Sequence, residues 1–331
     1  MKAFTFCKVL FALLKEFRTQ QKFNTEYLIP RLASIEAKCN GHFTDEQIFK
    51  IKKYYAIFIP TLISSQLKYI YSQRLSEIER ERATLFGILT PLYDDIFDQE
   101  SLPETDYKQI TIKPHDYEGR SFQSLVVKLL QSELICKASN PEKYLEACEQ
   151  VMEAQLRSRL QTDSTIPVSE LEKITFNKGG YSMLLFFQLL DQDKILSVHE
   201  LVYTIGSAYQ LCNDIFDIYK DVRDGIYTLP NTCTDFVVLK KNFILKIKTQ
   251  NAELKRLDLG LKKTRHLLIS LNLVNARALV ALDHLIRAYP VSTPDPFTYW
   301  KSKARHELVI DMEKPGNIIK WMWYIYKIAA Y

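Results

Sequence analysis

Residues 85–98 read LFGILTPLYDDIFD, an apolar run that ends in three aspartates. A second run, residues 201–221, reads LVYTIGSAYQLCNDIFDIYKD and ends in a similar acidic cluster. Both runs have the apolar pattern of buried helices. Because residues four apart are neighbours on a helix surface, each cluster places its acids on one stripe. Acids that emerge from otherwise apolar helices indicate a lined cavity rather than a solvated surface.

The composition favours a protein built from helices alone. Of the 331 residues, 47% are hydrophobic and 25% are charged, as in globular proteins. Only 9 glycines and 12 prolines leave little room for the turns that many short strands need. No repeat and no linker rich in Gly, Ser or Pro interrupts the chain. We therefore expect one all-α domain over residues 1–331, with residues 1–43 as an N-terminal helical extension.

Charge and cysteine usage disfavour several classes of protein. The net charge of +5 is modest and basic residues are mixed with acidic ones, which disfavours nucleic-acid binding. The six cysteines form no CxxC pair, which predicts neither a zinc site nor a disulfide framework and favours the cytoplasm. Lys8 interrupts the apolar run within residues 1–14, so we expect an amphipathic helix there. No uninterrupted apolar window approaches ~18 residues, so no stable membrane insertion is expected.

Capping residues, prolines and glycines predict where helices begin and end. Capping-box spacing predicts starts at three pairs, namely Thr44 with Gln47, Ser169 with Glu172, and Ser197 with Glu200. A further start is predicted at Asn140–Pro141, and an end at Gly225. Kinks or breaks are expected at Pro60 and Pro91. The predicted loops are residues 99–121, 191–196, 224–235 and 288–297.

The acidic clusters have the residue types that bind magnesium. Mg²⁺ prefers oxygen ligands and usually binds through one or two carboxylates plus phosphate oxygens and waters. The candidate ligands are Asp94, Asp95 and Asp98 in the first cluster, and Asn213, Asp217 and Asp221 in the second. Roughly 120 residues separate the clusters, enough for several helices, so the two can face each other across a bundle. A solvated helix face explains one such cluster equally well, but two in apolar context favour a metal site.

The first cluster carries a resemblance to a known family. Asp94, Asp95 and Asp98 match the aspartate-rich motif DDxxD without substitution. In this the chain resembles the class I isoprenoid synthases, the all-helical group that contains terpene cyclases, trans-prenyltransferases and squalene or phytoene synthases. The resemblance spans residues 80 to about 230.

The second cluster resembles more than one branch of that family. Asn213, Asp217 and Asp221 are similar to the cyclase motif NDxxSxxxE, with aspartate in place of the usual hydroxyl residue and of the last glutamate. Together with the following GIYTLP of residues 225–230, the cluster also resembles the second motif of phytoene synthases. Asn213, Asp214 and Asp217 equally resemble the NDxxD motif of prenyltransferases, whose next loop commonly ends in Thr-Leu-Pro.

The resemblance implies a helical bundle around a central apolar cavity, with Asp94 and Asn213 on opposite walls of its mouth. It implies a Mg²⁺-dependent terpene synthase, a lyase that ionises farnesyl or geranylgeranyl diphosphate, releases diphosphate and cyclises the carbocation. Three Mg²⁺ ions, or Mn²⁺ in their place, are the implied cofactor. The resemblance also allows a homodimer. Phe86, Gly87 and Leu89 are candidates for setting the depth of the cavity.

Several basic residues are candidates for binding the diphosphate, on which charge develops as the carbon–oxygen bond breaks. Lys178, in the sequence Asn-Lys-Gly-Gly, resembles the Lys-Thr-Gly of prenyltransferases, and its two glycines would permit a helix break. Lys220 and Arg223 flank the second cluster. Arg287 and Tyr289 resemble the Arg-Tyr pair of cyclases, although Ala288 separates them. We assign catalytic roles to Asp94, Asp95, Lys178 and Arg223.

Two alternatives to a cyclase stay open. The first is a prenyltransferase or a head-to-head coupling enzyme of the squalene or phytoene synthase type. The second is a catalytically silent helical scaffold or prenyl-lipid binder, for which the altered second motif is the support. Product analysis separates all three.

Overall fold

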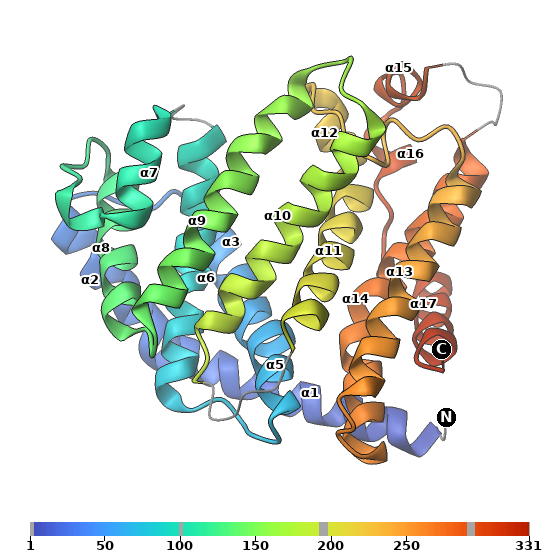
Figure 1. Cartoon of the computed structure of the whole chain (residues 1–331), viewed down its shortest axis with the longest axis horizontal. Helices are drawn as coiled ribbons and strands as arrows, with labels where there is room; N and C mark the ends of the chain where they lie inside the picture. The colour runs from blue at the N-terminus through green and yellow to red at the C-terminus, as the bar shows by residue number, and fades with distance from the viewer. Residues whose placement is uncertain (1–2, 99–101, 192–197, 290–294, 331) are drawn as a thin grey trace. The chain divides into compact units, whose positions relative to one another are not determined.

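The computed structural model describes residues 3–98, 102–191, 198–289 and 295–330 (Figure 1). Within these ranges every regular element is a helix, and helices make up 81% of the structure. The prediction of an all-α fold is therefore confirmed.

The chain divides into two compact units. Unit 1 consists of residues 1–7, 154–184 and 196–331, and unit 2 of residues 8–153 and 185–195. The first acidic cluster lies in unit 2 and the second in unit 1. That the whole chain forms one domain around a central apolar cavity stays a prediction.

Unit 2 is built mainly from the first nine helices. Their bounds are α1 Ala3–Phe23, α2 Ile29–Cys39, α3 Asp45–Lys50, α4 Ala56–Phe58, α5 Ser65–Ile70, α6 Glu77–Asp98, α7 Glu104–Ile112, α8 Phe122–Lys137 and α9 Pro141–Arg157. Wider π-helical turns occupy Asn24–Leu28, Ile51–Tyr55 and Ile59–Ser64, and a 3₁₀ turn occupies Pro114–Asp116.

Unit 1 contains the remaining helices. Their bounds are α10 Val168–Gln188, α11 His199–Phe216, α12 Ile218–Asp224, α13 Phe236–Arg256, α14 Leu261–Ala288, α15 Pro296–Lys301, α16 Arg305–Leu308 and α17 Pro315–Ile328, preceded by a 3₁₀ turn at Ser158–Thr162. Of α10, the part up to Leu184 belongs to this unit.

Three predicted helix ends are confirmed. The side chain of Thr44 accepts a hydrogen bond from the backbone N–H of Gln47 (3.2 Å), and the Gln47 side chain accepts one in return (3.0 Å). Asn140 caps α9 by accepting from the backbone of Lys143 (3.0 Å). Gly225 ends α12 in the left-handed conformation (φ 75°), which glycine adopts without a steric penalty.

Other predicted boundaries are corrected or lie outside the described residues. The capping box predicted at Ser169 is wrong, because α10 already begins at Val168. Ser197 lies outside the described residues, and α11 begins at His199. Pro91 lies inside α6 without ending it, because the helix continues to Asp98. At Pro60, by contrast, a π-helical turn interrupts the regular α-helix, in agreement with the predicted kink or break.

The predicted loops are confirmed only in part. Residues 225–235 contain no helix, as expected. Most of the loop expected at 99–121 is wrong, because α7 and a 3₁₀ turn occupy its centre, while residues 99–101 lie outside the description. In the other two loops, residues 192–196 and 290–294 also lie outside the description. The helix expected at the N-terminus is confirmed as α1.

The helix that carries the first acidic cluster is buried in unit 2. Leu85, Ile88, Leu89 and Leu92 of α6 are fully buried, as the apolar pattern predicted. A Cβ placed on Gly87 would lie 2.8 Å from backbone atoms of Ala56, so this glycine allows α4 to cross α6 closely. Gly87 therefore contributes to helix packing, and its proposed role in setting a cavity depth stays a prediction.

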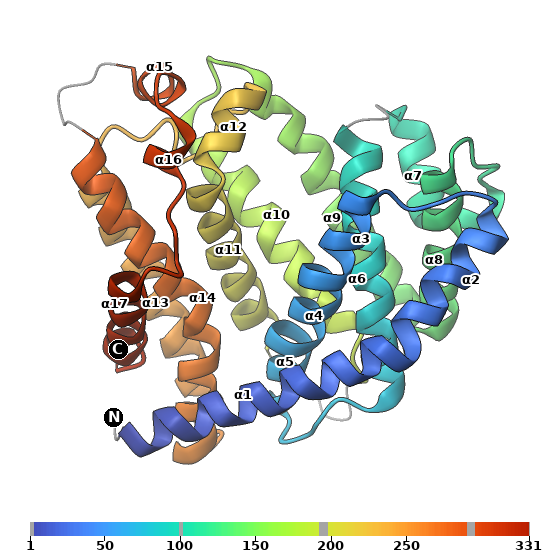
Figure 2. The same ribbon diagram turned by 180° about the vertical axis from the view of Figure 1, so that it is seen from behind.

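Helix α14 is the central helix of unit 1. It packs against α11, α13 and α17, and α13, α14 and α17 lie side by side (Figures 1 and 2). It is also the one described helix that is long and apolar enough to cross a membrane, judged by length and composition alone. Since 72% of its apolar window is buried inside the structure, as in the core helix of many proteins, this is weak evidence for a span.

Candidate functional site

Two glycines bring α10 and α11 into close contact within unit 1. A Cβ placed on Gly179 would lie 2.2 Å from the carbonyl oxygen of Gly206, and a Cβ on Gly206 would lie 2.2 Å from that of Gly179. Helix α10 runs through Gly179 and Gly180 without interruption, so the predicted helix break is wrong. These glycines instead permit the two helix backbones to touch. The contact brings together side chains of α10 and α11 that lie about one turn from the glycines.

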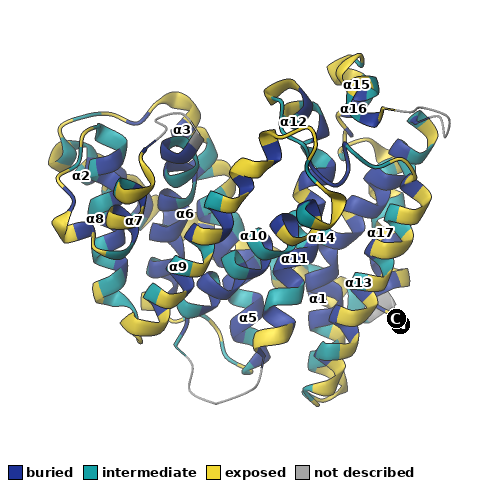
Figure 3. Cartoon of the chain, turned by 45° about the horizontal axis from the view of Figure 1, so that its top comes forward, coloured by how far each residue is buried: buried dark blue, intermediate teal, exposed yellow. Residues whose placement is uncertain are grey.

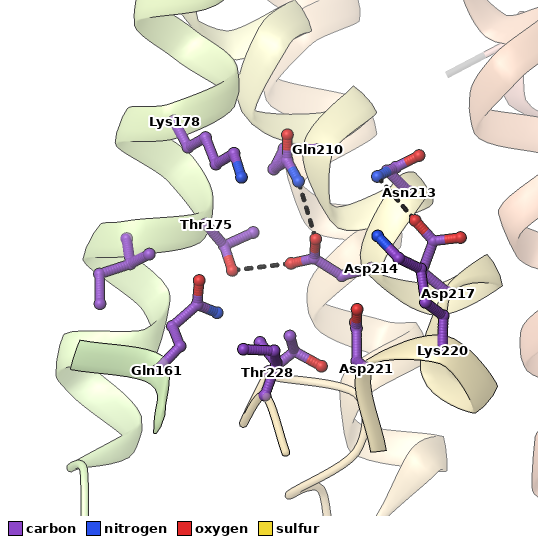
Figure 4. A pocket seen from close by; sticks show the side chains of 12 residues that line it. Gln161, Thr175, Lys178, Gln210, Asn213, Asp214, Asp217, Lys220, Asp221 and Thr228 are labelled. Atoms are coloured by element: carbon purple, nitrogen blue, oxygen red, sulfur yellow. Dashed lines mark hydrogen bonds between the residues drawn. The ribbon is translucent and has the colours of Figure 1, made fainter. Parts of the chain in front are cut away.

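A polar cavity of about 110 Å³ opens beside this contact (Figure 4). That volume holds several waters or a small ion. Its lining comes from α10, α11, α12 and the segments around residues 161 and 226–228, and consists of Gln161, Ile174, Thr175, Lys178, Gln210, Asn213, Asp214, Asp217, Lys220, Asp221, Ile226 and Thr228. Five predicted site residues, Lys178, Asn213, Asp217, Lys220 and Asp221, are thus brought together.

Asp214 is the most firmly held acid in the cavity. The Thr175 hydroxyl donates to one of its carboxylate oxygens (2.9 Å), and the Gln210 side-chain amide donates to the other (2.8 Å). Burial nonetheless raises the pKa of Asp214 to about 6. From the sequence, Asp214 was predicted only as part of a motif, and Thr175 was not predicted at all. Thr175 and Asp214 lie 39 residues apart in the sequence, and only the packing of α10 on α11 brings them together.

Asn213, Asp217 and Asp221 lie on one stripe, as predicted, although the stripe continues from one helix into the next. Helix α11 ends at Phe216 and α12 begins at Ile218. Even so, the backbone N–H of Asp217 donates to Asn213 (2.9 Å), and that of Asp221 donates to Asp217 (2.8 Å), as within one helix. The Asn213 amide N–H also donates to the Asp217 carboxylate (3.0 Å), which leaves the amide oxygen of Asn213 available as a ligand.

The surrounding protein disfavours the ionised form of Asp221. Burial, and then the neighbouring carboxylates of Asp214 and Asp217, raise its pKa to about 8. Burial likewise raises the pKa of Asp217. Among the described residues, no side chain donates a hydrogen bond to the Asp221 carboxylate, which points into the cavity (Figure 4). A cation bound beside Asp221 would therefore stabilise its ionised form.

Two lysines line the same cavity without pairing to its acids. Lys178 comes from α10 and Lys220 from α12. Within the part of the chain that the structure describes, neither ammonium group lies within 4.0 Å of a carboxylate. The cavity thus presents separated positive and negative groups, an arrangement suited to a ligand that carries charges of both signs, such as a metal–phosphate complex.

The loop after α12 closes one end of the cavity and is itself tightly held. The backbone N–H of Tyr227 donates to the carbonyl of Gln161 (2.7 Å), and the Gln161 side chain donates back to Tyr227 (3.0 Å). Asn231, fully buried, bonds the backbone of Thr228 and of Ile226 (2.8 Å each). The Thr228 hydroxyl is buried without a partner within the described residues, so it can donate to an oxyanion in the cavity.

The donor set of this cavity fits Mg²⁺. It offers the carboxylates of Asp217 and Asp221 and the amide oxygen of Asn213, all hard oxygen ligands. In the described ranges, no three His, Cys, Asp or Glu side chains form a ready metal cage. Mg²⁺ does not require one, because it usually takes one or two carboxylates and completes its shell with phosphate oxygens and waters.

The first acidic cluster lies on α6 in unit 2. The Gln47 side chain donates to Asp95 (2.8 Å), and the Lys50 ammonium lies 4.0 Å from it, so α3 holds this carboxylate in place. Asp94 is half-buried, and the side chain of Asp98 lies outside the described residues. That these aspartates face Asn213, and that they bind metal, stay predictions.

Three predicted diphosphate ligands lie outside the cavity lining. Arg223 is exposed on α12 and pairs with Asp224 (3.4 Å). Arg287 is exposed near the end of α14. Tyr289 is buried, with its ring packed against Phe236, Tyr299 and Trp300. A part in binding stays a prediction for Arg223, Arg287 and Tyr289.

No protein-family model matches the chain, and no curated protein matches it significantly.

Proposed function

We propose that the chain is a Mg²⁺-dependent terpene synthase that ionises an allylic prenyl diphosphate and cyclises the resulting carbocation. The observation that carries the proposal is the cavity of unit 1, where Asp217 and Asp221 lie with Lys178 and Lys220 but form no ion pair with them within 4.0 Å. A diphosphate with its metal ions supplies both missing partners at once. The motif resemblance of the two acidic clusters gives the substrate class.

The residues of the cavity divide between the two parts of such a ligand. Asn213, Asp217 and Asp221 would hold Mg²⁺ through oxygen atoms. Bound Mg²⁺ would neutralise negative charge that develops on the diphosphate as it leaves. Lys178 and the unpartnered Thr228 hydroxyl would bind the diphosphate oxygens directly. Asp94 and Asp95 are the further ligands that the DDxxD motif adds in this proposal.

The reaction requires no redox partner. The bond between the allylic carbon and the diphosphate oxygen breaks, and its electron pair leaves with the oxygen. The allylic cation is then attacked by a double bond of the same prenyl chain, which closes a ring, and transfer of a proton to the released diphosphate leaves a neutral hydrocarbon. The chain's own contribution is to fix positive groups at the departing oxygens and to exclude water from the cation.

Asp214 has a different role in this proposal. Both of its carboxylate oxygens already accept hydrogen bonds, from Thr175 and Gln210. The bond from Thr175 connects α10 to α11 beside Lys178 and Asn213, and the bond from Gln210 fixes the Asp214 carboxylate within α11. We therefore assign Asp214 to positioning: it fixes the distance between the helix that carries the lysine and the helix that carries the metal ligands.

The experiment that tests the proposal is an incubation of the purified protein with allylic diphosphates of ~10, 15 and 20 carbons and Mg²⁺, read by gas chromatography. A cyclic hydrocarbon from one diphosphate alone supports a terpene synthase. A longer diphosphate formed on adding isopentenyl diphosphate, or a coupled hydrocarbon without ring closure, would instead identify a prenyltransferase or a coupling enzyme. No product from any substrate would leave the scaffold alternative.

A further inference from the structure

The last helix of the chain, α17, exposes a row of large apolar side chains. Five of them are exposed, namely Ile318 (39%), Ile319 (68%), Met322 (43%), Trp323 (51%) and Tyr326 (48%). We call this set the α17 apolar stripe. Its members recur at spacings of three and four residues, so they form one continuous face of the helix. Burying one such side chain is favourable, and this face leaves five in water.

The opposite face of α17 is fixed to unit 1, so the stripe has a defined orientation. The Trp321 indole N–H donates to the carbonyl of Leu273 in α14 (2.8 Å). Lys240 of α13 donates to the Tyr324 hydroxyl, which donates in turn to Asp283 of α14 (2.8 Å each). These bonds hold the buried face of α17 against α13 and α14. Figure 3 shows exposed residues along the outer sides of α13 and α17.

Two lysines border the stripe on α17 itself. Lys327 is exposed and Lys320 half-buried, and they flank Tyr324 at spacings of three and four residues. The Lys327 ammonium lies 4.7 Å from the centre of the Trp323 ring, so charge and apolar surface are in direct contact. No acidic residue follows Glu313 in the sequence.

A second row of lysines continues this basic border onto α13. Lys241, Lys248 and Lys255 are exposed and seven residues apart, which places them on one face of the helix. Asn251 lies one turn from both Lys248 and Lys255 and is buried, and its amide donates to the carbonyl of Ile328 in α17 (2.8 Å). The row therefore borders the contact with α17. We call these three lysines with Lys320 and Lys327 the basic band.

Positive charge is concentrated in the C-terminal part of the chain, which contains the stripe and the band. Residues 236–331 contain 17 Lys and Arg against 7 Asp and Glu, whereas residues 1–235 contain 27 against 32. The modest total of +5 thus combines a strongly basic C-terminal part with an acidic remainder. A basic face favours an anionic partner.

We propose that the α17 apolar stripe and the basic band dock onto the surface of an anionic lipid bilayer, with α17 lying in the plane of the interface. Trp and Tyr favour the boundary between lipid and water, because their rings are apolar and their N–H and O–H groups reach water. Lysines beside an apolar helix face are attracted to anionic headgroups. A symmetric second copy fits less well, because it would bring two basic bands together.

This docking differs from a membrane span, and it does not rest on the proposed enzymatic function. Helix α14, the one described helix with the length and composition of a span, is buried against its neighbours. Helix α17 has only 14 residues, too few to cross a bilayer. The stripe needs no unfolding to reach lipid, since all five of its side chains are already exposed.

The test is co-flotation of the full chain with vesicles of phosphatidylcholine alone or mixed with phosphatidylserine. Binding to the mixed vesicles only is expected, and brominated lipids should quench Trp323 fluorescence, with W323F as the reference for Trp300 and Trp321. No binding to either vesicle would overturn the proposal. Equal binding to both would overturn the part assigned to the basic band.

Variants distinguish binding through the stripe and the band from non-specific adsorption to the vesicles. I319A/W323A should lose at least about tenfold in partitioning. K320E/K327E should lose about 25-fold or more, because each lysine near an anionic surface contributes about fivefold. The matched controls are L160A/V168A, exposed apolar residues elsewhere in unit 1, and K173E on α10. Equal losses in the controls would overturn the proposal, as would a wild-type dimer that I319A/W323A converts to a monomer.

Discussion

Gly179 and Gly206 lie face to face where α10 meets α11, so close that a Cβ on either would lie 2.2 Å from the carbonyl oxygen of the other. Within about two turns of this contact, Lys178 and Thr175 on α10 line the same cavity as Gln210 and Asp214 on α11. The width of the cavity thus depends on the absence of two side chains.

The first prediction concerns this contact. The G206A variant must push α10 from α11, and we expect it to lower the free energy of unfolding by about 1–3 kcal/mol, the usual cost of overpacking. Urea denaturation measures this loss. G316A is the control, because a Cβ there meets nothing within 4 Å, and it should be neutral or stabilising by about 0.4–1 kcal/mol. If G206A unfolds at the same urea concentration as the wild type, the contact is not as tight as described.

The second prediction concerns Lys178. If its ammonium stabilises charge on the departing diphosphate, K178A should lower kcat/KM about 100- to 1,000-fold. K173A, on the exposed side of the same helix, should leave kcat/KM unchanged and controls for loss of any lysine from α10. The comparison uses steady-state kinetics with the substrate found active. Similar losses in both variants would remove Lys178 from the site.

The third prediction separates function from stability at Asp221. D221N removes a carboxylate that burial and two neighbouring acids disfavour, so in Mg²⁺-free buffer at neutral pH it should be at least as stable as the wild type. The same variant should weaken Mg²⁺ binding at least about tenfold, as judged by calorimetric titration. D224N, an exposed acid on the same helix, should change neither quantity. A D221N variant that is less stable yet binds Mg²⁺ normally would contradict the assignment.

The fourth prediction is a pH dependence in unit 2. Burial raises the pKa of Glu81, but hydrogen bonds from Lys137 (2.6 Å) and Tyr27 (2.7 Å) outweigh it and hold the pKa below its usual value. Since the folded pKa is the lower one, Glu81 stabilises the fold above the unfolded value of about 4.3 and loses this effect as the pH falls further.

E81Q should therefore lower the free energy of unfolding by about 1.5–3 kcal/mol near pH 7, the usual contribution of hydrogen bonds to a charged group. The difference from the wild type should shrink steadily below pH ~4.3. Urea unfolding across the pH range measures it. E149Q, whose exposed partner Lys108 lies 4.0 Å away, should show little difference at any pH. A constant difference for E81Q across pH would contradict the account.

Local sequence signals predicted the helical class and several helix ends. Thr44, Asn140 and Gly225 act within one helical turn, so a short stretch of sequence contains their whole cause. The Gly-Gly pair at residues 179–180 misled for the opposite reason. Glycine permits a break as well as a close approach, and only the partner helix, where Gly206 faces Gly179, decides between them.

The candidate site was predictable in its acids but not in its supporting residues. Asn213, Asp217 and Asp221 share a stripe that spacing alone reveals. Neither Thr175 nor Thr228 belongs to a motif. The role of Thr175 comes from its hydrogen bond to Asp214, and that of Thr228 from a buried hydroxyl without a partner among the described residues. A polar residue one turn before Lys178 was the signal that could have pointed to Thr175.

The measurement that tests the central claim most directly is release of diphosphate from an allylic prenyl diphosphate, followed with and without Mg²⁺. The account predicts release by the wild type only with Mg²⁺, a fall of at least about 100-fold in N213A and in D94A, and wild-type release by D224N. Release that does not require Mg²⁺, or that is unchanged in N213A and D94A, would contradict it.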